Sequence, residues 1–114
     1  MGPSVESLVD LGAKFGPNIV AGEWWRFFVP IFLHVGVAHI FLNMLMQIRV
    51  GRSLEISYGA LRIAPIYIIC GIFGNIISAI FLPTQVEVGA SGALFGFLGV
   101  LLSDLIQVKH YSCF

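Results

Sequence analysis

The sequence predicts an all-α membrane protein, a helical bundle with about three transmembrane helices in one domain. Of its 114 residues, 58% are hydrophobic and only 11% are charged, and the mean hydropathy is +0.95. An ordinary soluble domain has roughly 25% charged residues, and a soluble domain of this size could not bury so much apolar surface. The chain also contains three long uncharged stretches, as a membrane-spanning bundle requires. The expected surroundings of the protein are therefore lipid.

The N-terminal segment, residues 1–26, is mixed in character and is expected on the outer or lumenal side of the membrane. Within it, Val5 to Phe15 fits a short amphipathic helix lying at an interface. Glu6 and Asp10 stand where a signal peptide would have a basic region before an apolar stretch. We therefore expect no cleaved signal peptide here.

Three apolar segments, residues 27–48, 63–82 and 90–107, are the expected transmembrane helices. Each is close to the roughly 20 residues that a helix needs to cross the hydrocarbon core of a bilayer. Pro65 falls in the first turn of the second segment, where a missing N–H has little effect, and Pro83 follows its end. All three helices are assigned to a single domain.

The positions of the basic residues predict the topology. Arg49, Arg52 and Arg62 lie between the first two segments and Lys109 follows the third, whereas the loop between the second and third carries only Glu87. Because positive charge marks the cytoplasmic side, the first and third helices should run inward and the second outward. The loop before residue 90 should then lie on the outer or lumenal face.

Polar side chains inside the first apolar segment are the first candidates for function, because such groups are rare in lipid unless they face a cavity or one another. His39 and Asn43 are four residues apart and share one face of a helix. In a continuous helix, His34 would lie about 140° from His39 around the axis. A simpler interpretation is that His39 and Asn43 only form hydrogen bonds between helices.

The third segment begins with the sequence Gly89-Ala90-Ser91-Gly92. Gly96, Gly99 and Ser103 continue a stripe of small residues, which lets another helix approach closely and explains the glycines without any chemistry. Ser91 is different, because the N–H groups and the positive dipole at a helix N-terminus stabilise a developing oxyanion. A serine in a glycine-rich turn is also often only a helix cap.

Four short motifs occur in a fixed order along the chain. They are Trp25-Arg26, His39-x-x-x-Asn43, Glu55-x-x-x-Gly59 and Gly89-Ala90-Ser91-Gly92. In their order and spacing they resemble the rhomboid family of intramembrane serine proteases, over the range from Glu23 to about Gln107. The resemblance implies a six-helix core, of which this chain would supply about three transmembrane helices.

By this resemblance, Ser91 is the nucleophile that attacks a peptide bond in or near a transmembrane segment of a substrate. His39, Asn43 and the Ser91 N–H would form the oxyanion hole, and His34 would help to hold water in the cavity. These donors suit the role, because hydrogen bonds to charge are strongest where the dielectric is low. The residues given a structural role in the motifs are Trp25, Arg26, Glu55, Gly59, Gly89 and Gly92.

The sequence departs from the family pattern at the general base. Rhomboids use a Ser-His dyad whose histidine lies on a later helix, in a pattern like Ala-His-x-x-Gly that this chain does not contain. In a continuous helix His110 would lie about 28 Å from Ser91, too far to act as the base. We therefore expect residues 1–114 to be a partial, truncated rhomboid domain that supplies the nucleophile and oxyanion hole but not the base.

Two other functions fit the same features. The first is a catalytically inactive rhomboid-like protein that binds transmembrane clients, although Ser91, His39 and Asn43 are all retained. The second is a helical subunit of a channel or transporter, in which His34 and Asn75 would also line the pathway. Ion or proton transport is disfavoured because no charged residue occurs within the three segments up to residue 103.

Other partners are limited by charge and by ligand spacing. Six basic and six acidic residues give a net charge of zero, so no nucleic-acid partner is predicted. No group of His, Cys or carboxylate residues has metal-ligand spacing, so no metal or other cofactor is predicted. Cys70 and Cys113 are expected to be free thiols. The protein is expected to be an integral, multi-pass membrane protein. The sequence does not indicate which membrane contains it.

Overall fold

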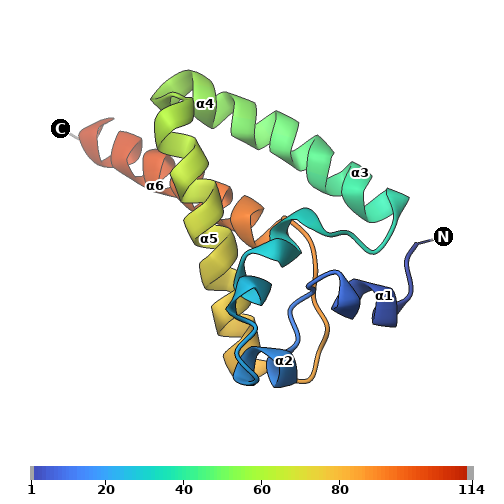
Figure 1. Ribbon diagram of the computed structural model, residues 1–114. Helices are drawn as coiled ribbons and strands as arrows, with labels where there is room; N and C mark the ends of the chain where they lie inside the picture. Colours follow the sequence, from blue (N-terminus) through green and yellow to red (C-terminus); the bar gives the residue numbers. More distant parts are fainter. Residues whose placement is uncertain (1, 113–114) are drawn as a thin grey trace.

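The computed structural model describes residues 2–112, and these residues confirm the predicted all-α class (Figure 1). Within them, backbone pairing outside the helices includes one isolated antiparallel bridge between Lys14 and Glu87. The elements in chain order are α1 (Val5–Asp10), α2 (Gly16–Val20), η1 (Trp24–Phe27), η2 (Val29–Phe32), α3 (Val37–Met46), η3 (Gln47–Gly51), α4 (Arg52–Tyr58), α5 (Ala60–Phe81) and α6 (Ser91–Ser112).

The two longest helices account for two of the three expected membrane spans. Between residues 2 and 112, Ala60–Phe81 and Ser91–His110 are the helices long and apolar enough to cross a membrane, with mean hydropathies of 2.0 and 1.6. They contain the expected segments 63–82 and 90–107 except for one residue of each. In Figure 1, α5 runs from the end of the molecule where α4 lies to the end where α2 lies, and α6 crosses it.

The expected helix over residues 27–48 is wrong at its start. Two short 3-10 helices and a stretch without helix occupy this region until α3 begins at Val37, and the helix then continues without a break to Tyr58. Pro30 explains part of the difference, because proline lacks an N–H and disfavours helical backbone at the residue before it. Arg49 and Arg52, expected between the first two spans, lie within this continuous helix.

The N-terminal segment is also less helical than expected. Instead of one helix from Val5 to Phe15, α1 ends at Asp10, and the chain then passes through a turn into the Lys14 bridge. Ser4 caps α1, with its hydroxyl accepting the Ser7 N–H at 3.2 Å. After Asp10 the chain pairs with the loop before α6, through Lys14 and Glu87. Local hydrophobic periodicity does not predict such a long-range pairing.

The buried core lies where α4, α5 and α6 meet. Leu54, Ile63, Leu94 and Phe97 are all at most 6% exposed and form one cluster. Close packing of such large apolar side chains stabilises the fold through dispersion contacts, since lipid is as apolar as the core and exclusion of water adds little there. Leu94 and Phe97 of this cluster lie within the first two turns of α6, close to Ser91.

Small residues bring α5 and α6 into close contact. A Cβ added at Gly92 would lie 3.8 Å from the Gly74 Cα, and one added at Gly96 would lie 2.4 Å from the Cys70 sulfur. At Gly99, by contrast, a Cβ would meet nothing within 4 Å. The first half of the predicted small-residue stripe therefore packs against α5. Cys70 is a free thiol, and Cys113 lies outside the described residues.

Candidate active site

Ser91 is the first residue of α6 and lines a small cavity of about 150 Å³. Its side chain is exposed, and within residues 2–112 no side chain is hydrogen-bonded to its hydroxyl. The cavity is shared between α5, the loop before α6 and the first turn of α6. Its lining consists of Gly71, Gly74, Asn75, Glu87, Val88, Gly89, Ser91, Gly92 and Phe95.

His39 and Asn43 both approach the loop that leads into Ser91. A Cβ placed on Gly89 would lie 2.8 Å from Nε2 of His39 and 3.3 Å from Nδ2 of Asn43. Gly89 has a φ of 115°, which disfavours any other residue, and its N–H donates to the Pro30 carbonyl at 2.8 Å. The structure therefore brings the sequence-predicted His39, Asn43 and Gly89 together, two residues before Ser91.

The contacts of His39 indicate which ring nitrogen carries the proton. Its Nδ1 accepts the backbone N–H of Val35 at 3.4 Å. In a neutral imidazole the other nitrogen, Nε2, is then the donor, and Nε2 is the atom that faces Gly89. The ring can thus offer an N–H to an oxygen near this loop.

His34 lies next to His39, and its expected separation of about 140° around a common helix is wrong. The two ring centroids are 5.1 Å apart, with the rings edge to face at 68°. The reason is that residue 34 precedes the start of α3 at Val37, so helical geometry does not apply to the pair. The His34 ring therefore lies on the same side as the other site residues.

Two polar atoms of this region are buried without hydrogen-bond partners: Nε2 of His34 and Nδ2 of Asn43. Asn43 as a whole is only 6% exposed. An unpaired buried donor is unfavourable by about 1–3 kcal/mol and is rare in folded proteins. The side-chain nitrogen of Asn43 thus lies unpaired beside the Gly89 loop.

Arg26, from the Trp25-Arg26 motif, is a buried connector and does not face the cavity. It is 5% exposed, and its guanidinium donates to the carbonyl oxygens of Val9 and Ala13 at 2.6 and 2.9 Å and pairs with Glu23. Trp25 itself is 44% exposed and stacks edge-on with Trp24. Arg26 therefore anchors the N-terminal segment against η1.

Sequence reasoning missed the role of Lys14 beside the loop that leads to Ser91. Lys14 is fully buried, its ammonium donates to the Leu82 carbonyl at 2.8 Å, and it lies 3.8 Å from Oε1 of Glu87. Burial lowers the pKa of this ammonium below its ordinary value, and the charge of Glu87 opposes that shift. A lysine in a mixed, polar segment gives no local signal of burial.

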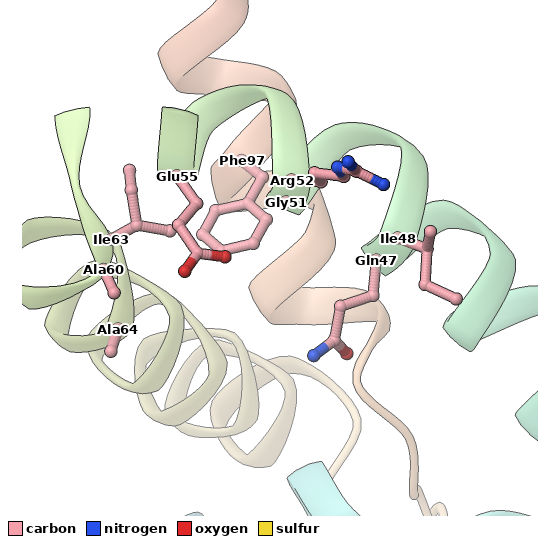
Figure 2. Close-up of a pocket in the computed structure, with 9 residues that line it drawn as sticks. All are labelled: Gln47, Ile48, Gly51, Arg52, Glu55, Ala60, Ile63, Ala64 and Phe97. Atoms are coloured by element: carbon pink, nitrogen blue, oxygen red, sulfur yellow. The ribbon is translucent and has the colours of Figure 1, made fainter. Parts of the chain in front are cut away.

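The Glu55-x-x-x-Gly59 motif lies away from Ser91. Gly59 ends α4 with a φ of 84°, and its N–H donates to the Glu55 carbonyl at 2.8 Å. Glu55 lines a separate cavity of about 490 Å³, which Figure 2 shows between α4, α5 and Phe97 of α6. None of Ser91, His39 and Asn43 lines that cavity. No group of three His, Cys or acidic residues within 2–112 could hold a metal ion.

Comparisons with known proteins place the chain in a family. Residues 21–113 match the Rhomboid domain family. The chain is 44% identical to RHOMBOID-like protein 6, mitochondrial, of Arabidopsis thaliana over 107 residues, which are 93% of this chain and 35% of that protein. It is 48% identical to Rhomboid protease GluP of Bacillus subtilis over 99 residues, which are 87% of this chain and 19% of that protein.

A third relative, Rhomboid-like protease 1 of Toxoplasma gondii, is 37% identical over 109 residues, covering 95% of this chain and 37% of that protein. The chain thus spans little more than a third of the length of these relatives at most. The family match nevertheless covers most of the chain, including the segments that carry His39, Asn43 and Ser91. The chain therefore belongs to the rhomboid family of integral membrane proteins.

Proposed function

We propose that this chain supplies the nucleophile and the oxyanion hole of an intramembrane serine endopeptidase that cleaves transmembrane protein substrates. Ser91 attacks the carbonyl carbon of the scissile peptide bond, and His39, Asn43 and the Ser91 N–H stabilise the resulting oxyanion. The observation that carries the proposal is the unpaired, buried Nδ2 of Asn43 beside the Gly89 loop. An N–H group that no protein atom accepts is suited to a charge that forms only during the reaction.

The general base in this proposal is a histidine outside residues 1–114. Ser91 requires such a base because a serine hydroxyl is a weak nucleophile at neutral pH. His110 is in the last turns of α6, whereas Ser91 is its first residue, so the helix itself keeps the two apart. His34 and His39 lie on the side of Asn43 and Gly89, where their N–H groups serve water and the oxyanion.

Labelling with a fluorophosphonate serine probe in detergent tests this proposal. We compare the 114-residue chain with an extended form in which a histidine-bearing span follows residue 114, each with and without Ser91→Ala. Labelling of the extended form that disappears with Ser91→Ala is the expected result. Absence of labelling in both forms contradicts the protease proposal and favours an inactive rhomboid-like protein that binds transmembrane clients.

A further inference from the structure

The Glu87 carboxylate lines the same cavity as Ser91 and brings a negative charge to it. A negative charge close to Ser91 opposes the formation of an oxyanion at that residue, because like charges repel. Both oxygens of Glu87 are engaged. Oε1 lies 3.8 Å from the Lys14 ammonium, and Oε2 accepts the hydroxyl of Ser78 from α5.

Lys14 also holds the main chain of the loop between α5 and α6 at two points. Its N–H donates to the Glu87 carbonyl at 3.0 Å, and its own carbonyl accepts the Glu87 N–H at 3.1 Å. Its ammonium donates to the Leu82 carbonyl at the end of α5. One buried residue therefore fixes both ends of the 82–87 stretch, immediately before Gly89.

Arg26 connects to Lys14 through the neighbouring residue. Its guanidinium donates to the carbonyl of Ala13, the residue directly before Lys14. A continuous chain of contacts thus runs from Arg26 through Lys14 to Glu87 and ends two residues before Gly89. The Trp25-Arg26 motif, which lies outside the cavity, is connected to the nucleophile loop in this way.

We propose that Lys14 and Glu87 are positioning residues for the Ser91 site, an inference that rests on the proposed protease function. The buried Lys14 ammonium neutralises the Glu87 carboxylate, and the pair holds the loop that presents Gly89 to His39 and Asn43. Neither residue touches the substrate. They affect the reaction by fixing the position of the loop before α6 and by setting the net charge in the cavity.

The test uses Lys14→Met, Glu87→Gln, the double variant, and Lys109→Met as a control that removes the same charge from an exposed position of α6. In the extended form, Lys14→Met should slow fluorophosphonate labelling at least about tenfold, because it leaves a carboxylate unpaired in the cavity and loosens the loop. Adding Glu87→Gln should restore the part of that rate that the unpaired charge removes, while the lost ammonium contact with the Leu82 carbonyl stays lost. A purely structural role predicts the reverse, because the second substitution removes a further contact.

Hydrogen exchange of the amides of residues 82–91 gives a second measurement that does not depend on catalysis. Lys14→Met should speed exchange there, while Lys109→Met leaves it at the wild-type rate. Unchanged labelling and exchange in Lys14→Met would overturn the positioning role. A double variant as slow as the single would overturn the proposed neutralisation of Glu87 by Lys14. A wild-type extended form that fails to label contradicts the proposed function instead, and exchange then decides the positioning role by itself.

Discussion

The side-chain amide of Asn43 lies against the backbone of Gly89, with its nitrogen buried and unpaired. A position two residues before the candidate nucleophile is thus in contact with a donor that makes no hydrogen bond in the resting protein. Stability alone gives no reason for such an arrangement, because an unsatisfied buried donor destabilises a fold.

Asn43→Ala should reduce labelling of Ser91 in the extended form by about 10²–10³-fold, the usual effect of removing one oxyanion donor. Thermal stability in detergent should not fall and should rise by up to about 1–3 kcal/mol, because no hydrogen bond of the Nδ2 group is lost and an unpaired buried donor is removed. Asn75→Ala is the matched comparison. Its Nδ2 donates to the Phe27 carbonyl at 2.9 Å, so that variant should lose about 1 kcal/mol of stability. Equal stability losses in the two variants would contradict this assignment.

Gly89→Ala should abolish most of the labelling and destabilise the protein by about 1–3 kcal/mol. The backbone φ of 115° is strained for alanine, and the new methyl group would collide with the His39 ring. Gly99→Ala is the control, because the added methyl meets nothing within 4 Å and alanine favours helix. Labelling rates and thermal unfolding of both variants measure the difference. Wild-type labelling by Gly89→Ala would show that the close approach of His39 is not required.

Arg26→Ala should lower the free energy of unfolding by about 2–4 kcal/mol, because it removes a buried guanidinium that donates to two carbonyl oxygens and pairs with the Glu23 carboxylate. Arg26→Lys should recover only part of that loss, since one ammonium lacks the planar fork of donors that reaches all three groups. Thermal unfolding in detergent measures both. Full recovery with lysine would mean that charge alone, and not hydrogen-bond geometry, accounts for Arg26.

The difference in stability between wild type and Lys14→Met should grow as the pH is raised. The pKa of Lys14 is lowered in the folded protein, so the unfolded chain binds this proton more tightly. Stability contributed by this group is therefore smallest below the folded pKa and increases as the pH rises through it toward the ordinary value of 10.5. Unfolding at a series of alkaline pH values gives the two curves. A difference that shrinks in that range would mean that pairing with Glu87 outweighs burial.

Hydropathy and motif spacing predict part of this structure well. They find α5 and α6 because an uncharged run of about 20 residues reports directly on the surrounding solvent. They fail between Phe27 and Gly36, because apolarity reports burial or lipid contact and not helical backbone, and Pro30 interrupts the pattern. The predicted separation of His34 from His39 is wrong because residue 34 lies in this non-helical stretch. The choice of His34 as a site candidate does not depend on helical geometry.

The contacts of Lys14 show the other limit of prediction from sequence. No local pattern links residue 14 to residue 87, since the pairing depends on how α5 returns the chain to the N-terminal segment. Gly89 was more accessible to reasoning, because it stands in a short motif with Ser91. Long-range polar contacts of single residues are set by the three-dimensional arrangement, and one sequence contains no periodic signal for them.

The contact between Lys14 and Leu82 also constrains the order in which the parts of the structure form during synthesis. Lys14 and the Leu82 carbonyl that it binds are 68 residues apart in the chain. The contact cannot form until the ribosome has synthesised both residues. Contacts between residues that are far apart in the sequence also form slowly. During synthesis the N-terminal segment therefore remains undocked until α5 has been inserted and its far end has emerged. Assembly of the nucleophile loop is consequently a late event in the biogenesis of this domain.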